Sequence, residues 1–205
     1  MSESIDFVPL LLDWFAQNRR DLPWRRSYDP YGVLVSEIMA QQTQMDRVAV
    51  YFERFMARFP TLAALAGADE TEVLKVWEGL GYYSRARNLL AAARRVMAEH
   101  GGRLPADFAA LRALPGVGDY TAGAVAAIAF GQDEVAVDAN VLRVLARVRD
   151  IDAPIKEPAG KAQATALARE LIPPGRARDY GEALMEFGAL VCRPRNPDCP
   201  ACPLA

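Results

Sequence analysis

Helix-forming segments fill nearly the whole of this 205-residue chain, and only short polar or Pro/Gly breaks separate them. Runs such as LLAAARRVMAEH and ATALARELI combine high helix propensity with an apolar stripe at helical spacing. Pro30 stands where a helix begins, so its missing N–H removes no hydrogen bond. EVAV at 134–137 has extended character, but four residues do not make a sheet. The sequence therefore predicts an all-α protein, with helices at about residues 5–18, 31–43, 45–59, 61–65, 70–78, 84–100, 108–113, 120–129, 139–148, 161–171 and 179–191.

The composition allows a full core but gives no support to nucleic-acid binding. Hydrophobic residues make up 52% of the chain, which is enough for one domain or two small lobes. The net charge is −2, although a basic stripe on one face can coexist with an acidic remainder. Arginines flank Trp24 on both sides and follow the Tyr82–Tyr83 pair, and a solvated face is the competing interpretation of these runs.

The N-terminal residues MSESIDF lack a basic region followed by an apolar stretch, so we expect no signal peptide. No segment reaches the roughly 18 uninterrupted apolar residues that a membrane helix needs. These features predict a cytoplasmic or nucleoid-associated protein that does not contact a membrane.

A glycine-tight turn at LPGVGDYTAG, residues 114–123, joins two predicted helices. Gly116 and Gly118 have no Cβ, so the backbone there can adopt positive φ and approach another molecule closely. The amides that open the next helix, from about Asp119, lie at the positive end of a helix dipole and suit a phosphate. A helix–turn–helix packing corner explains the turn equally well.

Glu37 is the only charged residue between Tyr31 and Gln44. An ordinary surface helix carries several charges on its polar face. A solitary carboxyl among apolar neighbours is expected to be partly desolvated, which raises its pKa and suits it to donate a proton. A buried structural Glu, paired to an Arg or capping a backbone group, is the alternative.

Asp138 directly precedes a predicted helix and is expected to cap it. Helix amides that bond a carboxylate keep it ionised, and an ionised carboxylate can stabilise a developing cation. Capping and catalysis are therefore compatible at this residue.

The three cysteines, Cys192, Cys199 and Cys202, lie within the last fourteen residues at the spacing C-x6-C-x2-C. Clustered thiols in a chain predicted to be intracellular indicate metal ligands rather than disulfides.

Several of these segments resemble one known family. LPGVGDYTAGAV followed by VDANVLRVLAR is similar to the helix-hairpin-helix, Gly-Pro/Asp superfamily of DNA base-excision glycosylases. SEIMAQQTQ, YFERFMARFP and EGLGYYSRARNLL are similar to its MutY-type adenine DNA glycosylases, and the likeness runs from about Leu22 to the last cysteine. The resemblance implies two helical lobes with a cleft between them. One is a six-helix block, about residues 25–130, with the hairpin at 108–129; the other combines 1–24 with 131–205 and an iron–sulfur loop at 192–205.

The resemblance also implies a mechanism. Glu37 would protonate the departing adenine and handle the incoming water, while Asp138 would stabilise the oxocarbenium-like sugar, electrostatically or through a transient covalent adduct. Bifunctional relatives of the endonuclease III type carry a Schiff-base lysine where this chain has Tyr120, so strand cleavage by a lysine imine is not expected. Tyr120 would instead hydrogen-bond near Asp138 and the sugar; a core aromatic is the alternative.

Further residues acquire binding roles from the same likeness. Gln42 and Tyr82 would enter the DNA stack, with Tyr82 at the lesion and Gln41 beside them. The adenine pocket would be lined by Arg20, Leu22, Trp24, Arg25 and Glu182. The hairpin would hold DNA phosphate through Gly116, Val117, Gly118, Tyr120 and Thr121. Each of these is an ordinary surface or core residue when the resemblance is set aside.

The family carries a fourth cysteine five residues after the third and binds a 4Fe–4S cluster through four thiolates. This chain stops at Ala205, so a shortened chain, a substitute ligand and the absence of an intact cluster are all open, with a shortened chain favoured and a three-Cys zinc site less so. The domain that reads 8-oxoguanine in the family is also missing, which predicts weak discrimination between A·8-oxoguanine and A·G.

The sequence thus predicts a monomeric, monofunctional adenine DNA glycosylase, or its catalytic core, that acts on double-stranded DNA containing A·8-oxoguanine or A·G. A thymine, uracil or oxidised-pyrimidine glycosylase of the same superfamily is one alternative. A non-catalytic helix-hairpin-helix DNA-binding module is the other.

Overall fold

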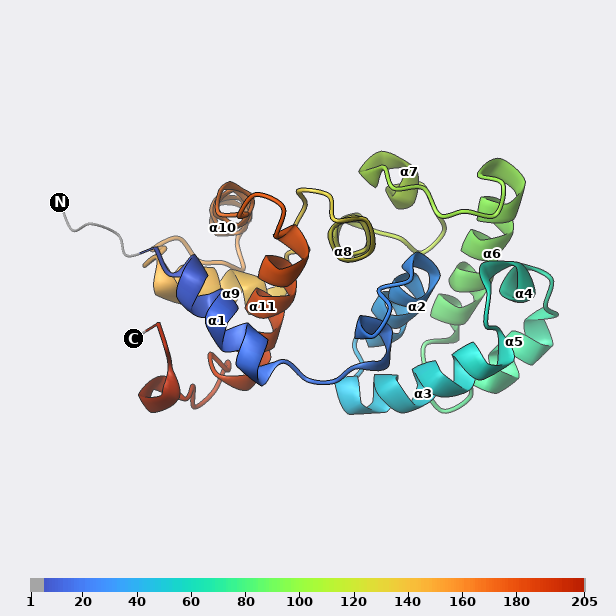
Figure 1. Ribbon diagram of the computed structural model, residues 1–205, viewed down its shortest axis with the longest axis horizontal. Helices are drawn as coiled ribbons and strands as arrows, with labels where there is room; N and C mark the ends of the chain where they lie inside the picture. The colour runs from blue at the N-terminus through green and yellow to red at the C-terminus, as the bar shows by residue number, and fades with distance from the viewer. Residues whose placement is uncertain (1–5, 205) are drawn as a thin grey trace. The chain divides into compact units, whose positions relative to one another are not determined.

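The fold is all-α, as the sequence predicts (Figure 1). The computed structural model describes residues 6–204, and within them no β-strand occurs. No helix in this range is both long and apolar enough to cross a membrane. The α-helices are α1 (Val8–Asn18), α2 (Pro30–Ala40), α3 (Met45–Arg58), α4 (Leu62–Ala66), α5 (Glu70–Trp77), α6 (Tyr83–Glu99), α7 (Phe108–Arg112), α8 (Asp119–Phe130), α9 (Ala139–Val148), α10 (Pro158–Glu170) and α11 (Ala177–Leu190), with 3₁₀ turns η1 (Pro23–Arg25) and η2 (Cys199–Ala201).

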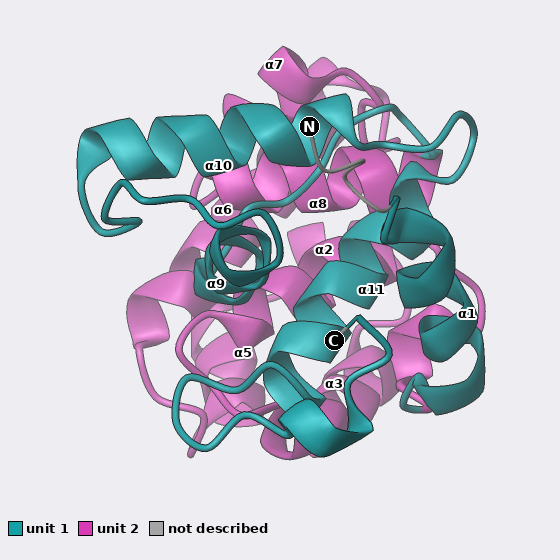
Figure 2. Cartoon of the chain, turned by 90° about the vertical axis from the view of Figure 1, so that its left-hand side faces the viewer, with its two compact units in different colours: residues 1–20, 131–205 teal, residues 21–130 magenta. Residues whose placement is uncertain are grey.

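The chain divides into two compact units, coloured separately in Figure 2. Unit 1 comprises Met1–Arg20 and Gly131–Ala205, and unit 2 comprises Asp21–Phe130. Unit 1 is thus built from both ends of the chain, while unit 2 is continuous.

Helix α2 is the centre of unit 2. It packs against α3, α6, α8 and η1, and every residue from Tyr31 to Met39 is buried. Such burial on all sides is the pattern of a core helix rather than a surface helix. Pro30 is its first residue, and the Asp29 carboxylate caps it by accepting from the Gly32 amide at 2.9 Å. The sequence places a helix here because its residues are apolar all round.

The predicted end of α2 was three residues too late. The helix ends at Ala40, because Gln41 has non-helical backbone angles (φ −55°, ψ 110°) and Gln42 lies in the left-handed region at φ +57°. Residues 41–44 therefore form a loop before α3. The segment EVAV at 134–137 is irregular.

Unit 1 packs α1 and α9 against α11, with α10 on α9. Phe187 of α11 meets Trp14 of α1 edge to face, with ring centroids 5.1 Å apart. One residue further along α11, Gly188 lies against the start of α9. A Cβ at Gly188 would stand 2.6 Å from the Asn140 Cβ, so the two helices approach closely because a glycine is present.

Changing Gly188 to Ala should push α9 away from α11, since the new methyl meets both the side chain and the backbone of Asn140. We expect the free energy of unfolding to fall by about 1–3 kcal/mol. Urea denaturation measures this, with Ala189→Ser at the neighbouring exposed position as the control. Equal stability of the two variants would contradict the close approach.

Candidate active site

Glu37 lies in the middle of α2 with only 7% of its surface exposed. The residues on either side are buried as well, and the Ser36 hydroxyl turns inward to donate to the Val33 carbonyl at 2.8 Å. The burial expected from the sequence is confirmed. A carboxyl group held in such surroundings is suited to proton transfer.

Two loops of unit 2 flank the end of this helix, and each contains a residue predicted to enter DNA. Gln42 in the first loop is exposed and has a positive φ. Tyr82 in the second loop is 59% exposed, and its φ is +49°. The side chain of Gln41, in contrast, contacts α8, where its amide donates to the Thr121 hydroxyl at 3.4 Å.

The glycine turn joins α7 to α8 and so forms the predicted helical hairpin. Gly116 has φ +75°, and a Cβ there would lie 2.6 Å from the Asn88 Cβ of α6. The fold itself therefore requires this glycine. Gly118 does not have positive φ, and a Cβ there would have open space around it.

The hairpin residues differ in what they can offer a ligand. The side chains of Val117 and Thr121 are buried, and the Val117 amide donates to the Leu114 carbonyl at 3.1 Å. The exposed open side of the turn is at Gly118 and Asp119, with Tyr120 partly exposed. First-turn amides such as those of Asp119 and Tyr120 lack intrahelical acceptors, so the donors that this turn can offer lie at the start of α8.

Two of the predicted pocket residues are part of the core of unit 2. Leu22 and Trp24 are 5% and 6% exposed, and Trp24 packs edge to face on Phe52 with centroids 5.3 Å apart. Arg25, in the same 3₁₀ turn, is partly exposed.

Asp138 caps α9, as the sequence predicts. Its Oδ1 accepts from the Val141 amide at 2.8 Å, and its Oδ2 accepts from the Asn140 side-chain amide at 2.6 Å. The Asn140 Oδ1 accepts in turn from Arg143 at 2.7 Å. Arg143 also donates to the carbonyls of Gly188 and Cys192, at 2.8 and 2.9 Å. Burial lowers the pKa of this guanidinium, and the series of hydrogen bonds connects Asp138 to the cysteine segment.

Arg20 and Glu182 lie in unit 1 beside a third residue, Glu186, whose carboxylate was not predicted to belong to the site. Glu186 is 2% exposed and binds Arg20 through both oxygens, at 2.8 Å to Nε and 3.0 Å to Nη2, while also accepting from the Arg20 amide at 3.0 Å. Glu182, one turn earlier on α11, is equally buried.

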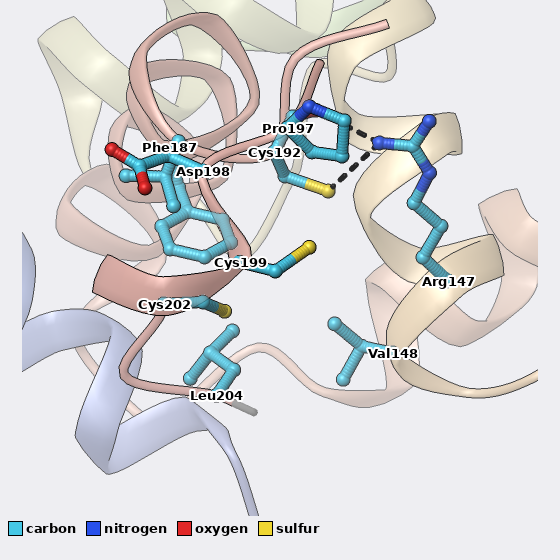
Figure 3. Close-up of a pocket in the computed structure, with 10 residues that line it drawn as sticks. Arg147, Val148, Phe187, Cys192, Pro197, Asp198, Cys199, Cys202 and Leu204 are labelled. Atoms are coloured by element: carbon cyan, nitrogen blue, oxygen red, sulfur yellow. Dashed lines mark hydrogen bonds between the residues drawn. The ribbon is translucent and has the colours of Figure 1, made fainter. Parts of the chain in front are cut away.

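The three cysteines line one cavity of about 240 Å³ (Figure 3). Its other walls are mostly apolar, and the Arg147 Nη1 donates to the Cys192 Sγ at 3.4 Å. The lining residues are Arg147, Val148, Phe187, Val191, Cys192, Pro197, Asp198, Cys199, Cys202 and Leu204. All three thiols are free.

This donor set fits a thiolate-bound metal group in part. Soft sulfur donors in an apolar cavity suit iron–sulfur or zinc, and a neighbouring guanidinium suits a negatively charged group. Three thiols supply three of the four ligands that a 4Fe–4S cluster takes. Within residues 6–204, however, no three Cys, His, Asp or Glu side chains are close enough together to bind one ion.

Residues 35–174 match the profile of the HhH-GPD superfamily base excision DNA repair proteins. That match covers more than half of the sequence. The chain belongs to the HhH-GPD superfamily.

Similar HhH-GPD proteins include adenine DNA glycosylases. The one from Homo sapiens is 46% identical over 213 residues, which cover 100% of this chain and 39% of that protein. The one from Mycolicibacterium smegmatis is 41% identical, with 95% of this chain and 66% of that protein covered. The chain therefore spans about two fifths of the length of the human relative.

Solved structures in the superfamily show the same fold. A thermostable thymine-DNA glycosylase has a TM-score of 0.86 and 34% identity, covering 97% of this chain and 91% of that one. A non-covalent endonuclease III–DNA complex has a TM-score of 0.80 and 25% identity, covering 96% and 89%.

Four residues of this HhH-GPD chain have roles in the structure that its sequence did not predict: Arg85, Asn140, Arg143 and Glu186. Two signals were available. Glu186 follows Glu182 by four residues, which places both on one face of a helix that carries no other charge after Asp179. Arg85 precedes Leu89 by four residues and so lies on the apolar stripe of α6.

Removing the Asn140 side chain should weaken the start of α9. Asn140→Ala takes one hydrogen-bond partner from Asp138 and one from Arg143, both partly buried, so we expect a loss of about 1 kcal/mol in the free energy of unfolding. Urea denaturation measures this. Asn18→Ala, which removes an exposed side-chain bond to the Trp14 carbonyl, is the control and should cost less.

Proposed function

We propose that this chain is a monofunctional adenine DNA glycosylase, which removes adenine paired with 8-oxoguanine or guanine and leaves an abasic site. The observation that carries the proposal is the buried Glu37 carboxyl at the centre of α2. It is supported by 46% identity to the human adenine DNA glycosylase along the whole chain.

The chemistry divides between two carboxyl groups. Glu37 donates a proton to the adenine ring as the bond between C1′ and N9 breaks and its electron pair moves to the base. Asp138, whose carboxylate caps α9, stabilises the positive charge that develops on the sugar. Water then adds to C1′, and its proton returns to the Glu37 carboxylate.

The presence of Tyr120 is the reason for proposing that the enzyme releases the base without cutting the DNA strand. A lysine amine at this place would attack C1′ and form an imine that permits strand cleavage. A phenol does not form an imine, so the abasic site is left intact. Tyr120 stands at the start of α8, partly exposed, where it can approach a bound sugar.

DNA binding is proposed to use the hairpin and the two exposed loop residues. The amides at the open side of the Gly118 turn hold a backbone phosphate, while Gln42 and Tyr82 occupy the space left by the extruded base. Chromosomal DNA as substrate would place the protein at the nucleoid. The similarity of the fold to endonuclease III in its DNA complex supports this mode.

The cofactor is proposed to be a 4Fe–4S cluster at Cys192, Cys199 and Cys202, with the remaining ligand supplied by another group. Such a cluster would be a structural element that fixes the segment after α11. No step of the reaction uses it.

A thymine glycosylase is the second candidate, because a thymine-DNA glycosylase is 34% identical with a TM-score of 0.86. The two candidates differ in the base that is released. A binding module without catalysis differs from both in releasing none.

Changing Glu37 to Gln should abolish base release and spare DNA binding. A carboxamide is far too weak an acid to protonate the adenine ring, but it has nearly the same size as the carboxyl group. We expect a fall of about 100-fold or more in the single-turnover rate. The measurement is base release from duplexes holding A·8-oxoguanine, A·G, T·G or U·G, each analysed with and without alkali.

Glu99→Gln, which alters an exposed carboxylate paired with Arg95, is the matched control and should keep the parent rate. Adenine loss, with strand breaks only after alkali, supports the proposal. Thymine or uracil loss would move the chain to the second candidate, and an active Glu37→Gln variant would overturn the assigned role.

Replacing Cys199 by Ser should lower the iron and acid-labile sulfide bound by the purified protein, since a serine hydroxyl is a poor substitute for thiolate. Metal analysis and the visible absorption spectrum report the change. Asp198→Asn alters the same cavity without removing a thiol and tests whether Asp198 is the remaining ligand. Zinc in place of iron in the parent protein would contradict the cluster.

A further inference from the structure

Arg85 is the third residue of α6 and is buried to 7% exposure. Arginines are seldom buried without a carboxylate partner. Over the described part of the chain no ion pair of Arg85 is found, and burial lowers the pKa of its guanidinium. Its charge is balanced by backbone oxygens and aromatic rings instead.

One nitrogen of the guanidinium serves the end of α2, the helix that carries Glu37. The Arg85 Nη1 donates to the carbonyls of Met39 at 2.8 Å and Ile38 at 3.2 Å. The last carbonyls of a helix have no intrahelical donor, and a cation there is favoured by the helix dipole. Arg85 therefore caps α2 from a distant element.

The two hydrogens of this nitrogen are shared between the end of α2 and the first loop. The nitrogen lies 2.5 Å from the Gln41 carbonyl and 3.2 Å from the Thr43 hydroxyl. These two acceptors lie on either side of Gln42, whose φ is +57°. The bonds fix the loop that presents the exposed Gln42 side chain.

The other nitrogen serves the second loop. The Arg85 Nη2 donates to the carbonyls of Leu80 and Gly81, at 3.3 and 3.2 Å. The guanidinium carbon also lies 5.3 Å from the ring centroid of Tyr82 and 5.6 Å from that of Trp77. In this loop Gly79, Gly81 and Tyr82 all have positive φ.

We propose that Arg85 is the positioning residue that holds the Gln42 loop and the Tyr82 loop in register, so that both side chains enter the DNA together. The inference rests on the proposed glycosylase function. Tyr82 cannot be placed by a hydrophobic core, because 59% of its surface is exposed. The guanidinium fixes the positions of both loops instead, because one nitrogen bonds the Gln42 loop and the other bonds the Tyr82 loop.

An arginine is required for this arrangement. The guanidinium is a planar fork whose two terminal nitrogens point to different acceptors, whereas the lysine ammonium is a single point. Arg85→Lys keeps the charge but loses the simultaneous hydrogen bonds to the Gln42 loop and the Tyr82 loop. We therefore expect each loop to move independently in that variant.

The test compares Arg85→Lys with Arg94→Lys. Arg94 lies on the same helix and likewise bonds two carbonyls, those of Ala66 and Ala68, but it touches neither loop. Base release is measured under single-turnover conditions. Duplex affinity and the fluorescence of 2-aminopurine at the target position are measured in a Glu37→Gln background, which reports base extrusion without cleavage.

We expect Arg85→Lys to lower the rate of base release roughly 10- to 100-fold and to remove the fluorescence increase, with duplex affinity within a few-fold of the parent. Arg94→Lys should match the parent in all three. A purely structural role of Arg85 would change thermal stability without separating extrusion from affinity.

Gly81→Ala is the second variant, and it applies even where Arg85→Lys does not fold. Its methyl group meets no atom within 4 Å, so it disturbs only the backbone at φ +79°. Loss of extrusion in this variant supports the proposal. Parent-like extrusion in Gly81→Ala, or in a folded Arg85→Lys, overturns it, whereas a parent protein that releases no base refutes the proposed function instead.

Discussion

The burial of α2 on every side is the constraint on which unit 2 depends. A helix that is apolar all round has to be enclosed, and α3, α6, α8 and η1 enclose it. Enclosure leaves the carboxyl of Glu37 shielded from bulk water, and it leaves the carbonyls at the helix end without solvent. The guanidinium of Arg85 supplies the hydrogen-bond donors that these buried carbonyls would otherwise lack. The burial of α2 therefore both shields the proposed acid, Glu37, and requires a buried donor at the helix end, Arg85, which we propose also orders the neighbouring loops.

In unit 1, hydrogen bonds orient the carboxylate of Asp138. Asp138 needs its two oxygens oriented, and it receives one backbone amide and one side-chain amide. The second donor, Asn140, is oriented in turn by Arg143, which also binds the carbonyls of Gly188 and Cys192. The close approach at Gly188 keeps these groups within hydrogen-bonding distance. The direction of the proposed catalytic carboxylate thus depends on how α11 and the cysteine segment pack on α9.

The sequence predicted most of what local chemistry controls. The helices, the Pro30 start, the Asp138 cap and the burial of Glu37 all follow from propensity, capping and apolar pattern, and the structure confirms them. The end of α2 was predicted too late, because the helix is stopped by an external guanidinium and by the left-handed Gln42 rather than by a Gly or Pro. Glu186 and Arg85 were missed for the same reason. Their i, i+4 spacing signals burial, but their partners lie 166 and up to 47 residues away in the chain and follow from no local pattern.

The fold alone does not select the base. A thymine-DNA glycosylase shares this architecture at a TM-score of 0.86, and endonuclease III shares it at 0.80. Specificity has to come from side chains placed on a common scaffold. In this chain Leu22 and Trp24 are core residues of unit 2, and Arg20 of unit 1 is bound by Glu186. Under the proposed function, the choice of adenine depends on the proton that Glu37 supplies, since a purine leaves readily only after its ring has been protonated.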